Sequence, residues 1–277
     1  ISGSDANLVT IDSDDGEVRL LSSADYETKA FYSFDVEVSD GELSDTQTIT
    51  FNVTDVDDND ILNGTDGDDT LEGGFFDDIL FASLGNDYID GGSGIDTLVF
   101  GDLDTVVDLR SGKDGKAQDT GHGMDTIMTG TIENVTTGSG NDTIYGQGLD
   151  NVIQAGSGND YINAKSGNDT LNGGAGDDIL TGGTGMDRYV FEGLFGDDTI
   201  KGFDGSEDTI DLSGITGAQV TAQGFGNAVR LNVADANGTE QGTILLERMG
   251  IDEWDEFDQD SIFIINPSLA GIITSTI

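Results

Sequence analysis

Residues 137–190 read TGSGNDTIY, GQGLDNVIQ, AGSGNDYIN, AKSGNDTLN, GGAGDDILT and GGTGMDRYV when the chain is divided every nine residues. The sixth position of the unit is polar in all six copies: Asp142, Asn151, Asp160, Asp169, Asp178 and Asp187. The eighth position is apolar in all six: Ile144, Ile153, Ile162, Leu171, Leu180 and Tyr189. A fixed short period of this kind predicts a parallel β-roll, in which each unit supplies one turn and one short strand.

The composition of the unit predicts a calcium site at each turn. Glycine at positions one, two and four lets the backbone adopt φ > 0 and brings carbonyl groups close to one point. The aspartate adds a hard carboxylate, and Ca²⁺ prefers six to eight hard oxygen ligands. Two units complete one turn of the roll, so carboxylates 18 residues apart should face one site. The predicted pairs are Asp142 with Asp160, Asp160 with Asp178, and Asp169 with Asp187; Asn151 with Asp169 is weaker, because an amide brings no charge.

A shorter block of the same repeat spans residues 64–99, as GTDGDDTLE, GGFFDDILF, ASLGNDYID and GGSGIDTLV. Its sixth positions are Asp69, Asp78, Asp87 and Asp96, which should pair as Asp69 with Asp87 and Asp78 with Asp96. Phe76 replaces the fourth-position glycine of the second unit, and Phe75 precedes it. Either a site is lost there, or the two aromatic rings cover the end of the roll, as solenoids require.

Residues 100–136 interrupt the repeat. We expect a strand pair in VFGDLDTVVDLR (99–110), with Val106, Val107 and Leu109 as its apolar residues, and an exposed loop in KDGKAQD (113–119). GHGMDTIM (121–128) resembles a displaced unit with Asp125 in the aspartate position. Asp125 precedes Asp142 by 17 residues rather than 18, which should shift or spoil the site. His122, the only histidine, is expected to be a solvated loop residue.

The charge balance agrees with the repeats. The chain has 277 residues, with 55 Asp plus Glu against 10 Lys plus Arg and a net charge of −45. A chain so charged repels itself unless counter-ions bind, and it has no basic patch to meet the phosphates of a nucleic acid. A disordered Gly/Asp linker is the alternative, but disorder would not keep an apolar residue at every eighth position. There is no cysteine, and no apolar run is long enough to span a membrane. Because Ile1 is not an initiator methionine, we expect the chain to be a piece of a longer protein.

Residues 1–60 differ in texture, with strand-like runs at 8–12, 17–22, 31–40 and 47–56. With IDSDDGEV, DYE at 25–27, SDG at 39–41 and DVDDND at 55–60, this stretch resembles the later part of a cadherin-type β-sandwich. The resemblance implies calcium ligands, although its opening strands are absent and Asp57 stands where the family has Asn. The candidates are Asp25, Glu27, Asp40, Asp55, Asp57, Asp58 and Asn59.

After residue 190 we expect apolar strands, in which some of Asp197, Asp198, Asp204, Asp208 and Asp211 close the last site, and a hairpin at 227–248 that turns at Asn237-Gly238. A short helix follows from residue 251. The arrangement resembles the RTX (repeats-in-toxin) proteins that bacteria export by type I secretion. The implied fold is all-β: a partial cadherin-like sandwich (1–60), a calcium-bound parallel β-roll domain (61–265, with its β cap at 191–265), and a tail (266–277) that is part of the secretion signal.

The function that this resemblance implies is the non-catalytic C-terminal region of a large secreted adhesin at the bacterial cell surface. Its partners would be the type I secretion machinery and neighbouring adhesin domains, with a host or surface ligand bound elsewhere, and with no nucleic acid and no membrane insertion. One alternative is the RTX module of a secreted enzyme. Its catalytic domain would be missing from this sequence, since one histidine permits no HExxH zinc site. Another is an ice- or surface-binding roll, which the irregular third and fifth positions of the units disfavour.

Overall fold

The computed structural model describes residues 1–12, 16–22, 29, 31–39, 41–52, 59–110, 116–225, 228–247, 263–265 and 273–275. The chain divides into two compact units, residues 1–57 and 58–277. Within the described ranges, no helix has the length and apolar composition needed to cross a membrane. The short helix expected from residue 251 lies outside them.

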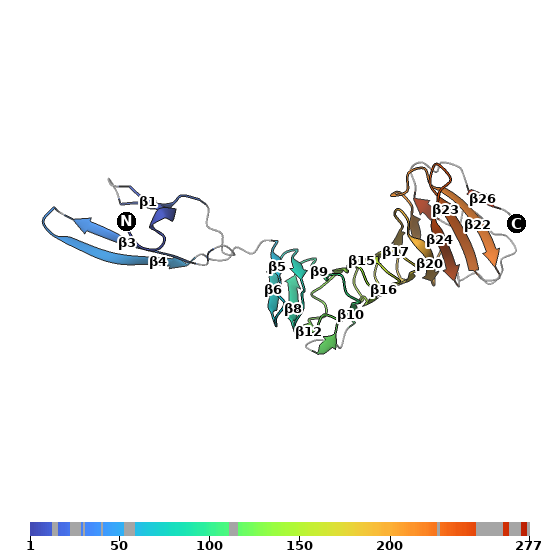
Figure 1. The fold of residues 1–277 in the computed structure, drawn as a ribbon, viewed down its shortest axis with the longest axis horizontal. Helices are drawn as coiled ribbons and strands as arrows, with labels where there is room; N and C mark the ends of the chain where they lie inside the picture. Colours follow the sequence, from blue (N-terminus) through green and yellow to red (C-terminus); the bar gives the residue numbers. More distant parts are fainter. Residues whose placement is uncertain are drawn as a thin grey trace. The chain divides into compact units, whose positions relative to one another are not determined.

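The N-terminal unit contains two antiparallel strand pairs and a short 3-10 helix (Figure 1). The elements are η1 (Ala6–Leu8), β1 (Val9–Ile11) with β2 (Val18–Leu20), and β3 (Phe31–Ser39) with β4 (Ser44–Asn52). Its buried apolar residues in the described ranges are Val9, Tyr32 and Phe34. The ring of Phe51 contacts Tyr32 and Phe34 with centroid distances of 5.3 and 6.0 Å. A core this small is marginal by itself.

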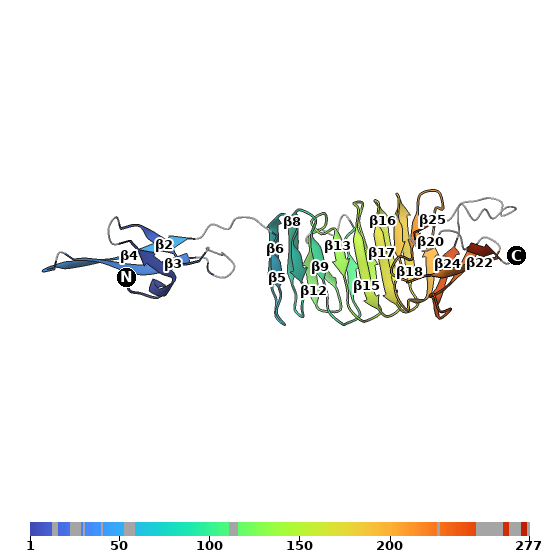
Figure 2. The same ribbon diagram turned by 90° about the horizontal axis from the view of Figure 1, so that it is seen from above.

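The second unit is a parallel β-roll whose strands follow one another along its length (Figure 2). One side is a nine-stranded parallel sheet. Its strands, in spatial order, are β5 (Ile61–Asn63), β7 (Ile79–Phe81), β9 (Thr97–Val99), β13 (Asn134–Thr136), β15 (Val152–Ser157), β17 (Thr170–Ala175), β19 (Arg188–Val190), β21 (Thr209–Asp211) and β25 (Phe263–Ile265).

The other side is made of two sheets. The first contains β6 (Thr70–Phe75), β8 (Tyr88–Ser93), β12 (Met124–Ile127) and the antiparallel β11 (Ala117–Asp119). The second begins with the parallel strands β10 (Val106–Asp108), β14 (Thr143–Tyr145), β16 (Tyr161–Ser166), β18 (Ile179–Thr184) and β20 (Gly196–Lys201). It continues into β24 (Glu240–Glu247), β23 (Ala228–Ala234), β22 (Gln219–Phe225) and β26 (Ile273–Ser275).

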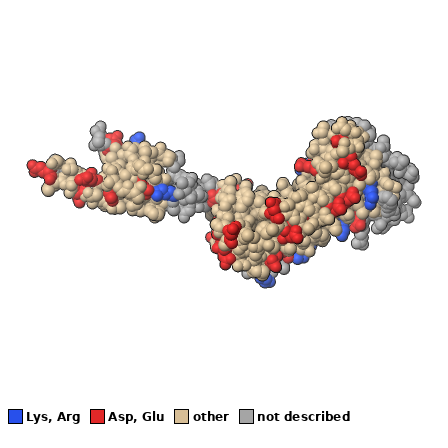
Figure 3. All heavy atoms as spheres, viewed as in Figure 1, with Lys and Arg blue, Asp and Glu red and all other residues tan. Residues whose placement is uncertain are grey.

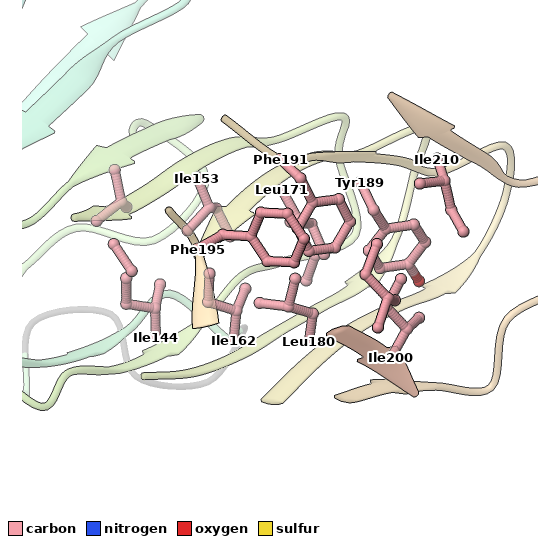
Figure 4. Packing of buried hydrophobic residues seen from close by; sticks show 14 of the residues in the cluster. Ile144, Ile153, Ile162, Leu171, Leu180, Tyr189, Phe191, Phe195, Ile200 and Ile210 are labelled. Carbon is pink, nitrogen blue, oxygen red and sulfur yellow. The ribbon is translucent and has the colours of Figure 1, made fainter. Parts of the chain in front are cut away.

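The core of the roll is one file of apolar side chains from each side (Figure 4). The middle residue of each three-residue strand unit points inward, which confirms the prediction for the eighth position: Ile144, Ile153, Ile162, Leu171, Leu180 and Tyr189 are all buried. Towards the C-terminal end, Phe191, Phe195 and Ile200 pack beside Tyr189. Because each short strand buries only one large residue, the roll gains stability from stacked neighbours rather than from any single unit.

The interruption at 100–136 differs from the prediction. Residues 97–99 and 106–108 do not form a strand pair, since β9 pairs with β13 while β10 pairs with β14 in another sheet. Val107 and Leu109 are buried as expected, but Val106 is 41% exposed. Residues 117–119, expected in a loop, form β11 against β12. The chain therefore first runs forward to form β10 beside β14, and it then returns to form β12 beside β8.

The end of the roll is covered by an antiparallel hairpin, as the sequence predicts. β23 and β24 pair around a turn in which Asn237 N–H and Thr239 N–H donate to Asp235 Oδ1, and Gly238 has φ +79°. β24 continues the roll by pairing in parallel with β20. Part of the C-terminal tail joins the same sheet, because β26 pairs in parallel with β22.

Candidate metal centres

The sixth-position aspartates form two files along the two edges of the roll, which we name the inner ladders. The first edge carries, in order, Asp69, Asp87, Asp125, Thr105, Asp142, Asp160, Asp178 and Asp198. The second edge carries Asp60, Asp78, Asp96, Glu133, Asn151, Asp169, Asp187 and Asp208. The order follows the strand stacking, since these residues immediately precede a strand, except Asp125 and Asp198, which lie within β12 and β20.

In the regular parts of the ladders, one carboxylate oxygen accepts a backbone N–H of the neighbouring turn. Asp142 N–H donates to Asp160 Oδ1 at 2.7 Å, and Asp160 N–H donates to Asp178 Oδ1 at 2.8 Å. On the second edge, Asp169 N–H donates to Asp187 Oδ1 at 3.0 Å. In the first block the corresponding bonds join Asp69 to Asp87 at 2.9 Å and Asp78 to Asp96 at 2.8 Å. The structure thus brings together all the residue pairs that the 18-residue spacing predicts.

The second carboxylate oxygen is buried without a hydrogen-bond partner at most of these positions. The oxygens are Oδ2 of Asp87, Asp96, Asp142, Asp160, Asp169, Asp178 and Asp187, in side chains that are 0–2% exposed. A buried polar atom without a partner is rare in folded proteins, and a buried carboxylate oxygen is costly unless a cation or donor meets it. A regular row of such oxygens therefore fits a row of bound cations.

Glycine keeps space open beside these oxygens. A Cβ on Gly173 would lie 2.1 Å from Asp178 Oδ2, and one on Gly182 would lie 2.0 Å from Asp187 Oδ2. A Cβ on Gly91 would lie 2.6 Å from Asp96 Oδ2 and 2.0 Å from the Thr131 carbonyl oxygen. No three acidic or histidine side chains of the described residues converge on one point, so backbone carbonyls must complete an oxygen shell. Hard oxygens of this kind suit Ca²⁺.

Burial raises the pKa of several inner-ladder carboxyls. The pKa rises to about 7 for both Asp160 and Asp169, although a backbone N–H to each carboxylate acts in the opposite direction. Burial raises the pKa of Asp198 to about 8 and that of Asp178 to about 6. The neighbouring carboxylates add repulsion, because Asp142 and Asp178 both face Asp160. A bound divalent cation would reverse both effects.

The other predicted ligands fall into two groups. Asp125 joins the first edge but next to Asp87, whose N–H donates to Asp125 Oδ1 at 2.8 Å, and its Oδ2 accepts the Thr120 hydroxyl. The cadherin-like candidates Asp25, Glu27, Asp40, Asp55, Asp57 and Asp58 lie outside the described residues. Asn59 lies in the roll unit, where its side-chain oxygen accepts from Asp77 N–H at 3.4 Å.

Three further acidic residues occupy ladder positions: Glu133, Asp198 and Asp208. Asp198 and Asp208 were among the residues predicted from the sequence as able to close the last site, whereas Glu133 was not predicted. Each precedes a strand triplet with an inward aliphatic residue, as in Asp208-Thr209-Ile210, and this local pattern could have revealed all three. Their spacing conceals them, because 37, 20 and 21 residues separate them from the partners Asp96, Asp178 and Asp187.

The aromatic pair in the first block does not cover a core. Phe75 and Phe76 are 58% and 54% exposed, and Phe76 keeps φ +74° at a position where most units have glycine. His122 also differs from its prediction: it is 8% exposed, its Nε2 lies 3.1 Å from Thr105 Oγ1, and its ring packs on Phe100.

The fifth positions form a separate, exposed ladder that runs in the opposite direction. Asn159 N–H donates to Asn141 Oδ1 at 2.9 Å, and Asp177 N–H donates to Asn159 Oδ1 at 3.0 Å. These side-chain oxygens accept N–H groups of the following turn, whereas the inner-ladder carboxylates accept N–H groups of the preceding turn. The polar fifth positions therefore have a structural role in fastening adjacent turns.

The sequence family of the RTX calcium-binding nonapeptide repeat matches residues 56–75, 63–98, 129–162, 136–171, 154–189 and 190–211. The chain contains RTX calcium-binding repeats. These matches fall on the inner ladders, and they identify Ca²⁺ as the ion of this RTX-type roll. No curated protein sequence matches this chain.

Among solved structures, the RTX chain is similar to two subunits of the mannuronan C5-epimerase of Azotobacter vinelandii. The AlgE6R3 subunit is 31% identical with a TM-score of 0.35, over 44% of this chain and 77% of that one. The AlgE6R2 subunit is 23% identical with a TM-score of 0.32, over 61% and 92%. The extracellular lipase LipA of Serratia marcescens is 20% identical with a TM-score of 0.27, and the match spans 73% of this chain and 39% of the lipase.

Proposed function

We propose that this chain is the calcium-dependent folding module of a large secreted bacterial adhesin, and that it folds only after export. The observation that carries the proposal is the row of buried carboxylates whose second oxygens lack a hydrogen-bond partner. Added to a net charge of −45, this arrangement makes the folded roll costly without cations. A costly apo state is the property that an export-coupled folding switch needs.

The residues of the inner ladders would perform the switch. Bound Ca²⁺ supplies the positive charge that lets neighbouring carboxylates approach. Asp160 and Asp178 keep one oxygen on the backbone of the preceding turn and present the other to the site, while the adjacent glycines leave room for it. Sites of extracellular modules have dissociation constants of about 10⁻⁴ to 10⁻³ M, so they would be empty in the cytosol and filled outside the cell.

The adhesin assignment rests on the resemblance of residues 1–60 to a cadherin-type module. An RTX module of a secreted enzyme is the alternative. Under that alternative the catalytic domain lies outside this sequence, so both readings give this chain a non-catalytic role. Export through the type I machinery, cell-surface attachment and contact with neighbouring adhesin domains belong to the same proposal.

Far-UV circular dichroism during a calcium titration tests the proposal. We expect an unfolded spectrum in chelator and a cooperative gain of β-structure in millimolar Ca²⁺, with magnesium at the same concentration as the control. A chain that is equally folded in chelator and in calcium would contradict the export-coupled mechanism.

A further inference from the structure

The two blocks of RTX repeats meet at a segment where both inner ladders change chemistry. We name it the junction: Thr105, Thr120, His122 and Asp125 on the first edge, and Ile132, Glu133, Gln147 and Asn151 on the second. Before it on the first edge stands Asp87, and after it stands Asp142; both have a buried Oδ2 without a hydrogen-bond partner. The residues between them do not continue that pattern.

On the first edge, neutral donors take the place of a cation. Both oxygens of Asp125 are occupied, Oδ1 by Asp87 N–H at 2.8 Å and Oδ2 by the Thr120 hydroxyl. Thr105 stands at the next ladder position without a carboxylate. Its hydroxyl donates to the Leu103 carbonyl at 2.8 Å and lies 3.1 Å from His122 Nε2. Among the residues that the structure describes, neither Asp125 nor Thr105 leaves a buried side-chain oxygen without a partner.

On the second edge, the side-chain amide of Asn151 takes the place of a carboxylate. Asn151 Oδ1 accepts from Gln147 N–H at 3.1 Å, and Asn151 Nδ2 donates to the Glu133 carbonyl at 2.7 Å. The Gln147 amide in turn donates to the Ile132 carbonyl at 2.6 Å. The carbonyls of Glu133 and Ile132 thus each use one lone pair on an amide N–H, and the Asn151 side chain adds no charge. Glu133 brings a carboxylate to this edge, but its Oε2 accepts the N–H of Asp96 at 3.0 Å. Within the described residues, both edges thus lack in this stretch the buried, unpartnered carboxylate oxygens of the two blocks.

We infer that the junction is a metal-free joint that divides the calcium array into two banks, residues 60–99 and residues 137–208, which load separately. The inference rests on the proposed calcium-dependent folding. Carboxylates within one bank share a file of equivalent sites, so loading one site relieves repulsion at the next. Across the junction no shared cation exists, and the neutral hydrogen bonds transmit less of that relief from one bank to the other.

Hydrogen–deuterium exchange of the full chain across a calcium titration tests this division, because peptides from the two banks are read separately. Asp87→Asn should raise the calcium midpoint of first-bank peptides by about tenfold or more, with a shift below about twofold in the second bank. Asp160→Asn should do the reverse. If either variant shifts both banks equally, the array is one unit and the inference is wrong.

Native mass spectrometry of bound calcium tests the joint directly. Asn151→Asp replaces the amide by an isosteric carboxylate, and it should bind one more Ca²⁺ than the wild type does. Asn159→Asp, the same change in the exposed ladder, is the matched control and should bind the wild-type number. An unchanged count in Asn151→Asp would overturn the joint. A wild-type chain whose two banks gain no protection with calcium would instead overturn the proposed function itself.

Discussion

An aspartate of the inner ladder gives its two oxygens different tasks. In Asp169, Oδ1 accepts the N–H of Asn151 at 2.8 Å, while Oδ2 has no partner. Asp169→Asn keeps an acceptor for the backbone but removes the charge. We expect its apparent calcium affinity, measured by isothermal titration, to fall by about tenfold or more. Glu240→Gln, an exposed change of the same charge on β24, should leave the affinity near the wild-type value, and equal losses would show that overall charge, not the site, matters.

Glycine at the first position of a unit is required by contact rather than by backbone conformation. A Cβ on Gly173 would lie 2.1 Å from Asp178 Oδ2, where the cation should bind. Gly173→Ala should therefore raise the calcium midpoint of folding by circular dichroism by about tenfold, without changing any charge. Gly148→Ala is the control, because its Cβ would meet only Ser166 Oγ at 3.4 Å. A Gly173→Ala midpoint equal to that of the control would place the cation elsewhere.

At the scale of single residues, the fixed nine-residue period made the ladder pairs predictable. Ladder residues at interruptions of this period could not be paired from the sequence. Asp142 and Asp160 could be paired from the sequence because nothing is inserted between their units. The pairing of Asp87 with Asp125 spans 38 residues and depends on how the chain folds back between them. For the same reason His122, expected in solvent, is buried against Phe100.

At the scale of the elements, the inner ladder behaves as a row of mutually repelling buried acids. In the folded, calcium-free roll, burial raises the pKa of Asp160 and Asp169 to about 7, above the value of an exposed aspartate near 4. Because the folded-state pKa of these carboxyls exceeds their unfolded-state pKa, their protonation stabilises the folded state. This stabilisation is fully present at a pH below the unfolded-state pKa and is lost as the pH rises through 7. In chelator, therefore, β-structure measured by circular dichroism should increase as the pH falls from 8 to 5.

With calcium the pH dependence should have the opposite sign, because binding needs deprotonated carboxylates. The midpoint concentration of calcium should rise as the pH falls from 8 to 6. If chelated protein is equally unfolded at both ends of the range, then burial in the folded roll does not govern its acid–base behaviour.

Elements whose contacts are local were predictable, and elements with distant partners were not. The hairpin β23–β24 follows from alternating apolar residues around Asn237-Gly238, all within a short stretch. The strand β10 reads much the same locally, yet it pairs with β14, whose residues lie 37 positions further along. Pattern alone cannot decide such a choice, because a short parallel strand with one inward residue fits any level of the roll.

At the scale of the whole molecule, the surface is dominated by one sign of charge. Acidic side chains are spread over the face seen in Figure 3, and few Lys or Arg lie among them. The net charge of −45 was sufficient to predict dependence on counter-ions. It could not show which carboxylates are buried, because that depends on the turn geometry of each unit.

The roll should fold without the N-terminal unit. The roll has a hydrophobic cluster of its own, which within the described residues runs from Leu62 to Leu246. A chain reduced to residues 58–277 should therefore keep the calcium midpoint of the full chain within about twofold, measured by circular dichroism. Removal of residues 191–277 should instead abolish calcium-induced folding, because it strips Phe195 and Ile200 from the end of the core and exposes Leu180 and Tyr189. If removal of residues 1–57 prevents folding while removal of residues 191–277 does not, the roll is nucleated from its N-terminal side rather than from its cap.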